Sequence, residues 1–345
     1  MPPVVSILLP NLNNRPYLEE RIRSIQEQTF ADWELIVVDS YSDDGAWEYF
    51  QECAQKENRI KLFQSAERGI YNNFNRCIRL AQGKYVYIAT SDDTMAPNAL
   101  EEMVKALEEN PGCDLAHCKL RIIDEDNNIS DQKLWDNFFI VRYFGDLINQ
   151  THIRKAPHDG VLHFSGITVY TSLTQLLIKR SLFDRIGLFL ENYGAPADYE
   201  WGMRATLIAD TVHVPQYLAT WRYHSKQATS ENAANIAKAS GKFIKMANHA
   251  LEIARKQNPI LIRPLNIKKL KYILEKEKLY YEIKTSQTKC RQKWTILKWS
   301  IINPHLLLEF KRNNEKNKDF VSQQDFLAYI KKMIAEHQLD KNLIA

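Results

Sequence analysis

Two adjacent carboxylates, Asp92 and Asp93, are the pair in this sequence best suited to share a cation. They follow an apolar, β-forming run at residues 85–89 and precede a helix expected at residues 97–109, a pattern typical of a buried parallel strand and its crossover helix. Ligands of open α/β sheets bind beyond the carboxyl ends of such strands, so both carboxylates should face that crevice. Adjacent carboxylates repel each other, and oxygen ligands favour Mg²⁺ or Mn²⁺, which usually bridge a protein to phosphate groups. The alternative is an acidic turn in which Asp93 or Thr94 caps the next helix.

The segments before this pair alternate between predicted strands and helices. Apolar runs at residues 4–9, 33–38 and 60–63 predict strands, and apolar residues at helical spacing predict helices at 17–28, at 46–55 and from 70 to the turn before Gly83. This alternation predicts right-handed crossovers and a doubly wound sheet. The loops that hold Asn11, Asp39 and Asp92 then lie along one edge. There Asp39 could accept a hydrogen bond from a base or a ribose, or it could be an ordinary turn residue.

Beyond residue 93 the pattern is looser. Strands are expected at residues 114–118, 119–123, 172–179, 211–215 and 217–223, and a short helix at 181–186. Residues 136–164 have no clean period but are rich in aromatic residues and histidines, which we expect to pack onto the sheet for the most part.

The glycine-rich motifs of dinucleotide sites and P-loops are missing from the sequence. Instead, three stretches together resemble the family 2 glycosyltransferases with the nucleotide-sugar-binding A-type fold, GT-A. They are residues 5–14 with the following helix to residue 30, residues 33–45, and residues 68–75 with 81–93. The resemblance implies an α/β fold with a Rossmann-like, doubly wound mixed sheet, followed here by a C-terminal helical extension.

The resemblance also implies roles for individual residues. In the family, the loop after the first strand and the equivalent of Asp39 hold the nucleotide base, usually uracil, and the Asp pair contacts the ribose and the metal-bridged diphosphate. Residues 221–225 are similar to the family's Arg-x-His ending, so His224 could complete a Mg²⁺ or Mn²⁺ shell with Arg222 in support, or it could be a surface histidine. The residues expected to bind the nucleotide sugar are Pro10, Asn11, Asn13, Asp39, Arg68, Asn72, Ser91, Asp92 and Asp93, and those expected to bind the metal are Asp92, Asp93 and His224.

Three positions near these motifs depart from the family pattern. Thr90 stands where the family often has Asp, Ser40 replaces a second Asp after the second strand, and Leu12 replaces a common aromatic that stacks on the base. The identity of the base therefore stays open.

A third carboxylate, Asp198, is the expected catalytic base. The family usually has Glu-Asp before a helix, with the Asp as base; here Ala197 replaces the Glu and Asp198 is retained. A carboxylate within hydrogen-bond reach of an acceptor hydroxyl can remove its proton as the oxygen attacks the anomeric carbon. The alternative for Asp198 is a helix N-cap, and Glu200 is the next candidate base.

The charge of the chain divides near residue 230. Residues 231–345 hold 23 Lys and Arg against 11 Asp and Glu, a net charge of +12, whereas residues 1–230 carry −8. We expect a GT-A nucleotide-sugar-binding and catalytic domain at 1–228 and a basic helical extension at 229–345. Basic residues interleaved with Trp294 and Trp299 predict contact with an anionic membrane surface, while packing on the catalytic domain or in a dimer is the alternative.

The expected function is transfer of a sugar from a nucleotide diphosphate sugar, with a UDP-sugar favoured, to a hydroxyl of a glycan or lipid-linked glycan in polysaccharide or glycoconjugate synthesis. Inversion follows from the family's single displacement. A non-catalytic nucleotide-sugar or glycan-binding protein of the same fold is the alternative, and nucleic acid is not an expected partner. Five cysteines without a CxxC pair, no basic leader and no long apolar segment indicate a cytoplasmic protein, peripheral at most at the inner membrane face.

Overall fold

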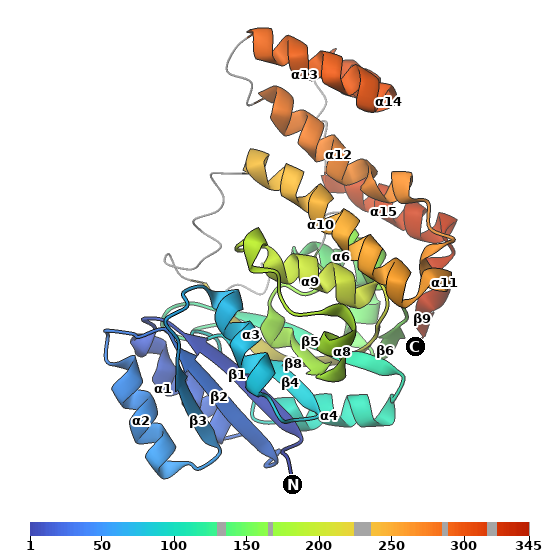
Figure 1. Cartoon of the computed structure of the whole chain (residues 1–345). Helices are drawn as coiled ribbons and strands as arrows, with labels where there is room; N and C mark the ends of the chain where they lie inside the picture. Colours follow the sequence, from blue (N-terminus) through green and yellow to red (C-terminus); the bar gives the residue numbers. More distant parts are fainter. Residues whose placement is uncertain (130–135, 165–167, 224–235, 285–288, 316–322, 345) are drawn as a thin grey trace.

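A computed structural model describes residues 1–129, 136–164, 168–223, 236–284, 289–315 and 323–344. Within these residues a single mixed sheet of nine strands runs through the molecule in the order β3-β2-β1-β4-β7-β5-β8-β6-β9 (Figure 1). The strands are β1 (Val5–Asn11), β2 (Trp33–Asp39), β3 (Ile60–Gln64), β4 (Tyr85–Ile88), β5 (Cys113–Ile123), β6 (His152–Arg154), β7 (Leu176–Lys179), β8 (Asp210–Arg222) and β9 (Leu343–Ile344).

The first four strands form the predicted parallel half of the sheet. β1 pairs in parallel with both β2 and β4, and Asn11 lies opposite Asp39 at the carboxyl ends of β1 and β2. β1, β2 and β4 are buried along their whole length, as strands covered on both faces must be. The connecting helices α1 (Arg15–Gln26), α2 (Ala46–Lys56), α3 (Ile70–Leu80) and α4 (Ala99–Glu109) agree with the sequence prediction within three residues at either end. The loops after β1, β2 and β4 thus meet at one edge, as predicted.

The second half of the sheet is antiparallel in part, and three strands stand there in place of five predicted ones. β7 pairs antiparallel with both β4 and β5, and only residues 176–179 of the predicted strand 172–179 are extended, because a short 3-10 turn, Leu173–Gln175, precedes them. β5 and β8 are each one strand rather than two. Their pairing shifts register around Cys118 and Lys119, and this irregularity interrupts the alternation that sequence patterns rely on.

Helices cover both faces of the sheet. α1, α2 and α4 pack on one face, whereas α3 packs on the other together with α7 (His158–Phe164), α8 (Ser181–Ile186), α9 (Ala197–Thr206) and α10 (Ile236–Gln257). The remaining helices are α6 (Phe139–Phe144), α11 (Pro259–Ile262), α12 (Ile267–Lys284), α13 (Lys289–Ile302), α14 (Pro304–Glu315) and α15 (Gln323–Glu336), and short 3-10 turns span Gly145–Asn149, Glu191–Tyr193 and Leu339–Asn342.

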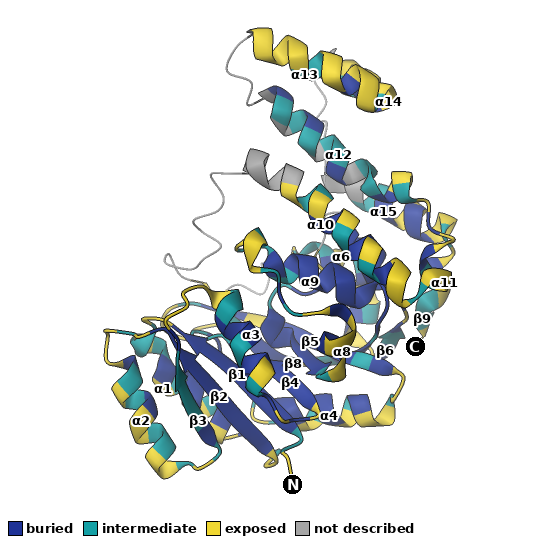
Figure 2. Ribbon diagram, in the orientation of Figure 1, coloured by how far each residue is buried: buried dark blue, intermediate teal, exposed yellow. Residues whose placement is uncertain are grey.

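The C-terminal helices divide into two groups. α10, the first half of α12 and α15 bury apolar residues in the same core as α9, and β9 pairs with β6 at the edge of the sheet. The end of α12, α13 and α14 form a separate small core, and Figure 2 shows α13 and α14 largely exposed beyond it. Among the described residues, none of the helices is long and apolar enough to cross a membrane. The predicted boundary at 228/229 lies outside the described residues and stays a prediction.

A buried row of histidines crosses the second half of the sheet. His152 on β6 lies opposite His213 on β8, which lies opposite His117 on β5. The Nδ1 atoms of His117 and His213 are 3.0 Å apart, and His213 Nε2 contacts the main-chain oxygen of Ile148 at 2.9 Å. Burial lowers the pKa of His117 and of His213 well below the usual range, and the positive charge of the nearby Arg154 lowers it further. Burial also lowers the pKa of His152, to about 4. The three rings are therefore uncharged in the folded protein at neutral pH.

These histidines should make the fold sensitive to acid. A histidine in the unfolded chain takes up a proton near pH 6.5, whereas these three side chains bind a proton only at lower pH in the folded protein. Between these pH values the unfolded state therefore binds more protons than the folded state. The stability of the fold falls as the pH falls from about 6.5 towards 4. The cost is about 2 kcal/mol at pH 5 for each histidine whose pKa is near 4. Urea unfolding at pH 7.5 and pH 5 measures it. His213→Gln should reduce the difference, His305→Gln on the exposed surface of α14 should not, and equal stability at both pH values would contradict the prediction.

Candidate active site

A cleft of about 420 Å³ opens at the carboxyl ends of the parallel strands. Its walls come from the loops after β1, β2 and β4, the start of α3, the segment before β7, the start of α9 and the end of β8. Of the residues predicted to act, it brings together Pro10, Asn11, Ser91, Asp92, Asp93 and Asp198.

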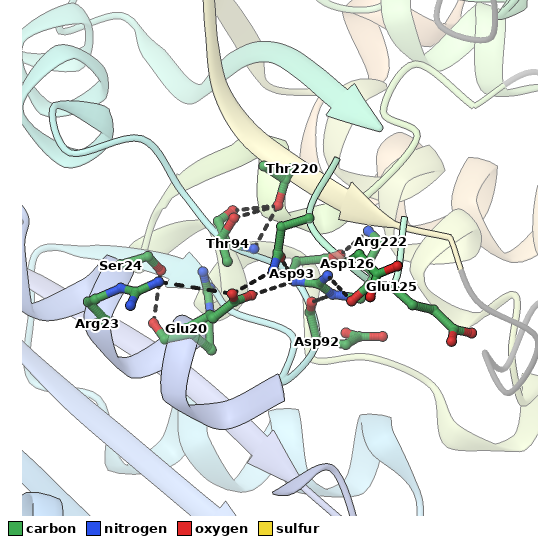
Figure 3. A network of polar contacts seen from close by, with 12 residues as sticks. Glu20, Arg23, Ser24, Asp92, Asp93, Thr94, Glu125, Asp126, Thr220 and Arg222 are labelled. Carbon is green, nitrogen blue, oxygen red and sulfur yellow. Dashed lines mark hydrogen bonds and ion pairs between the residues drawn. The ribbon is translucent and has the colours of Figure 1, made fainter. Parts of the chain in front are cut away.

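The two adjacent carboxylates have different environments within this cleft. Asp93 is 2% exposed, and its carboxylate accepts hydrogen bonds from the Thr90 hydroxyl (2.5 Å) and the main-chain N–H of Arg222 (2.7 Å). Burial, and next the charge of Asp92, raises the pKa of Asp93 to about 7. Asp92 is partly exposed, and Figure 3 shows its carboxylate turned away from the Asp93–Arg222 contacts. Asp92 therefore presents its carboxylate to the cleft, and Asp93 uses its carboxylate to hold the loop.

Arg222 fixes the backbone of this acidic loop. Its Nε donates to the main-chain oxygen of Asp92 at 2.7 Å, and its Nη1 donates to the main-chain oxygen of Asp124 at 2.8 Å. Its Nη2 pairs with Glu20 at 3.1 Å (Figure 3). The same Nη2 donates to the Asn127 side chain at 2.6 Å. The guanidinium is buried and all of its N–H groups point at protein oxygens, so it positions Asp92 rather than contacting a ligand itself.

Asp39 lies behind the cleft wall rather than on its surface. Its carboxylate is fully buried and accepts from the Asn11 amide at 2.9 Å, the Ser42 hydroxyl at 2.6 Å and the Ser42 main-chain N–H at 2.8 Å. Asn13, which has a left-handed backbone (φ 52°), donates its main-chain N–H to the Ser42 hydroxyl at 2.9 Å. In this arrangement Asp39 orients Asn11, and Asn11 is the residue of this group that faces the cleft.

Of the other predicted binding residues, Ser91 lines the cleft, whereas Arg68 and Asn72 do not. Arg68 is exposed, and its main-chain oxygen accepts from the Asn72 amide at 2.9 Å; Gly69 and Ile70 between them line the cleft, but Arg68 and Asn72 do not. Ser91 lies deeper and donates to the main-chain oxygen of Pro10 at 2.8 Å, which ties two cleft loops together. His224 lies outside the described residues.

Asp198 lines the same cleft from the start of α9. It lies in the first turn of α9, where the Tyr199 main-chain N–H donates to its Oδ1 at 2.7 Å. The neighbouring Tyr71 of α3 donates its hydroxyl to the main-chain oxygen of Ala195 at 2.7 Å. Burial raises the pKa of Asp198 to about 6, although the Tyr199 N–H and the Tyr71 side chain lower it. A carboxylate with such a pKa is largely ionised at neutral pH and can still accept a proton readily.

Glu200, the next candidate for the catalytic base, contacts two basic side chains outside the cleft. Its carboxylate is fully buried, pairs with Arg204 at 2.8 Å and contacts Nδ1 of His249 on α10 at 2.7 Å. It does not line the cleft. Glu200 thus joins α9 to the C-terminal helices, which leaves Asp198 as the carboxylate of α9 that faces the cleft.

Sequence reasoning missed several residues of the cleft wall. Tyr71, Ser172, Leu173 and Trp221 line it, from α3, the segment before β7 and the end of β8. Trp221 adjoins Arg222 in the stretch that resembles the family's Arg-x-His ending, and this position could have identified Trp221 as a cleft residue. Ser40 also lines the cleft and accepts a hydrogen bond from the Asn73 amide at 2.6 Å, so the serine that replaces an Asp links the second strand loop to α3.

The family assignment follows from comparison with known proteins. Residues 6–169 match the model of glycosyl transferase family 2. Over these residues, just under half of the chain, the protein is similar to glycosyl transferase family 2. The matched region carries the Asn11–Asp39 pair and the acidic loop; Asp198 lies beyond it. An uncharacterized glycosyltransferase of Methanocaldococcus jannaschii is 36% identical over 131 residues, which are 37% of this chain and 45% of the relative. The match thus spans less than half of that relative's length.

Two solved structures share the GT-A fold with this chain over almost its whole length. TarS of S. aureus, residues 1–349 in complex with UDP, has a TM-score of 0.60 at 13% identity, covering 98% of this chain and 89% of TarS. A mannosyltransferase of Pyrobaculum calidifontis in complex with GDP-Man and Mn²⁺ has a TM-score of 0.50 at 16% identity, covering 99% of this chain and 88% of that one. At such low identity the likeness shows the fold alone, and the predicted GT-A sheet with C-terminal helices is confirmed.

Proposed function

We propose that the chain transfers a glycosyl group from a nucleotide diphosphate sugar, with a UDP-sugar favoured, to a hydroxyl of a glycan or lipid-linked glycan. The observation that carries this proposal is that Asp92 and Asp198, far apart in the sequence, line one cleft beside Asn11. The match of residues 6–169 to the model of glycosyl transferase family 2 supports the reaction class. The complexes of TarS with UDP and of the mannosyltransferase with GDP-Man support a nucleotide or nucleotide sugar as the ligand of this fold.

The cleft fits a divalent cation of the Mg²⁺ or Mn²⁺ type. Among the described residues no group of three or more His, Cys, Asp or Glu side chains is placed to hold a metal by itself. Mg²⁺ is usually held by one or two carboxylates and completed by substrate phosphates and water, and Asp92 offers a carboxylate at the cleft surface for this purpose. The Mn²⁺ in the mannosyltransferase complex supports the same assignment. When bound, the ion neutralises the charge that develops on the leaving diphosphate.

Side chains of the cleft bind the donor and assist the transfer in this proposal. Asn11, oriented by Asp39, binds the nucleotide end of the donor. Arg222 holds the loop of Asp92 in the position from which the Asp92 carboxylate would hold the divalent ion. Asp198 accepts the proton of the acceptor hydroxyl while that oxygen bonds to the anomeric carbon. The bond from the anomeric carbon to the diphosphate oxygen breaks in the same step, and nucleoside diphosphate leaves. Attack from the face opposite the leaving group inverts the anomeric centre.

A donor screen tests this function. The protein is incubated with UDP-glucose, UDP-N-acetylglucosamine, UDP-galactose and GDP-mannose in Mg²⁺, Mn²⁺ or chelator, with a mixture of glycan acceptors, and release of nucleoside diphosphate is measured. We expect release from at least one donor, dependent on the divalent ion and increased by an acceptor. Donor binding without release from any donor would support the non-catalytic alternative, which Ala197 keeps open because the family's Glu is missing there.

The location in the cell is part of the same proposal. We infer a cytoplasmic enzyme, and the five cysteines, all unpaired in the structure, support a reducing compartment. Synthesis of a polysaccharide or glycoconjugate is the process that such a donor and acceptor serve.

A further inference from the structure

The hairpin of α13 and α14 exposes an unusual amount of apolar surface. Among the described residues, thirteen large apolar side chains are exposed, and five of them lie between residues 294 and 308. Figure 1 shows this hairpin stacked beyond α12, at the end of the molecule opposite to α4 and the N-terminus. The five are Trp294 (67% exposed), Leu297 (51%), Ile301 (78%), Ile302 (56%) and Leu308 (58%). Such clustering marks an interaction surface rather than the scattered apolar residues of an ordinary exterior.

The exposed residues of α13 form one stripe along the helix. Trp294, Leu297 and Ile301 are spaced by three and four residues and therefore lie on one face. The opposite face is already used, because Trp299 is 1% exposed, packs with Leu279 and Leu306, and donates its Nε1–H to Glu282 at 2.8 Å. α13 is thus apolar on two sides. The side with Trp299 packs inside the hairpin, and the side with Trp294, Leu297 and Ile301 is exposed.

Basic side chains accompany the exposed stripe. Residues 289–308 contain four Lys and Arg and no Asp or Glu. Arg291 and Lys293 are exposed next to Trp294, while Lys298 pairs with Glu282 at 3.0 Å. A stripe of Trp, Leu and Ile flanked by cations is complementary to a surface whose outer layer carries negative charge and whose interior is apolar.

We propose that the exposed face of α13, with Leu308 of α14, docks the protein on an anionic lipid bilayer. A second copy of this chain fits the face less well, because residues 289–308 hold four Lys and Arg and no Asp or Glu, so the segment offers no opposite charge to a copy of itself. α13 has 14 residues and is about 21 Å long, shorter than the roughly 30 Å of a bilayer core, so it lies in the plane of the interface. Trp294 is the expected anchor, because tryptophan favours the headgroup region.

Co-sedimentation of the full chain with vesicles tests the proposal. The vesicles are phosphatidylcholine alone and phosphatidylcholine with 40% phosphatidylglycerol, at about 0.05 and 0.5 M NaCl, where the Debye length falls from over 10 Å to below 5 Å. We expect binding to the anionic vesicles at low salt, with at least about tenfold weaker binding at high salt or to neutral vesicles. The double variant Trp294→Ala/Ile301→Ala should bind anionic vesicles at least about tenfold more weakly than the wild type.

The matched control is Ile260→Ala, which removes an exposed isoleucine (80%) of α11, outside the hairpin, and should bind as the wild type does. Circular dichroism and donor binding confirm that the double variant remains folded. Equal binding to neutral and anionic vesicles, no binding to either, or a double variant that binds normally would overturn the proposal. So would a wild-type dimer in sedimentation velocity that the double variant converts to a monomer, because the face would then belong to a second copy.

Discussion

Replacing Asp92 by Asn is expected to reduce turnover by a factor on the order of 10³ or more, while the fold persists. Asn has the same shape but no charge, so the cleft loses the carboxylate proposed to share a divalent ion with the diphosphate. The backbone of the loop is held by Arg222, whose Nε contacts the main-chain oxygen of Asp92, and the substitution leaves that contact in place. Steady-state release of nucleoside diphosphate measures the effect, and calorimetry should show that Mn²⁺ no longer tightens donor binding.

Asp126→Asn is the matched control for this variant. Asp126 is an exposed carboxylate of the neighbouring loop, shown beside Asp92 in Figure 3, and it does not line the cleft. We expect its replacement to change turnover by less than about twofold, because a charge in open solvent is strongly screened. Wild-type rates in Asp92→Asn, or full activity in excess chelator, would remove the metal from the proposed mechanism.

Replacing Asp198 by Asn should lower kcat by roughly two to four decades and leave donor affinity nearly unchanged. The amide cannot take the proton of the acceptor hydroxyl, but it keeps the volume of the side chain next to Tyr71. Asp184→Asn, at an exposed position on α8, is the control and should behave as the wild type. A variant with near-normal kcat would show that another group removes the proton; Glu200 is a poor substitute because Arg204 and His249 hold its carboxylate.

The pH dependence of turnover offers a second readout of Asp198. Burial raises the pKa of this carboxyl to about 6, and only its ionised form can accept a proton. Turnover of the wild type should therefore fall about tenfold for each pH unit below 6 and level off above it. The residual activity of Asp198→Asn should lack this acid limb. Rates must be taken from brief assays, because the buried histidine row makes the fold less stable in the same pH range.

The parallel half of the fold could be predicted because its signals are local. Runs of buried residues for β1, β2 and β4, separated by amphipathic helices, allow essentially one arrangement, and the edge that gathers Asn11, Asp39 and Asp92 follows from it. The placement of β7 between β4 and β5 could not be predicted in this way. It depends on antiparallel pairing between segments about ninety residues apart, for which no local pattern exists.

Contacts between distant segments also decide which of two similar residues is exposed and which is buried. The family resemblance favours Asp92 over Asp93 as the metal ligand, but the residue types alone do not explain the difference. The structure supplies a reason in β8, since the Arg222 main-chain N–H binds the Asp93 carboxylate and the Arg222 side chain binds the Asp92 carbonyl. Trp294 and Trp299 are likewise equivalent in sequence. The fold buries Trp299 against α12 and leaves Trp294 exposed, because α13 is apolar on both sides and its neighbours cover one of them.

The most direct test of the central claim is a crystal structure of the protein with Mn²⁺ and a UDP-sugar, with the anomalous scattering of manganese recorded. The claim is that one cleft holds the donor with its diphosphate near Asp92 and its anomeric carbon near Asp198, which takes the proton of the acceptor hydroxyl. It predicts a manganese peak about 2.0–2.2 Å from a carboxylate oxygen of Asp92 and bridged to the diphosphate, the base beside Asn11, and the anomeric carbon on the side of Asp198. A manganese peak on Asp198, or a nucleotide sugar bound outside this cleft, would contradict it.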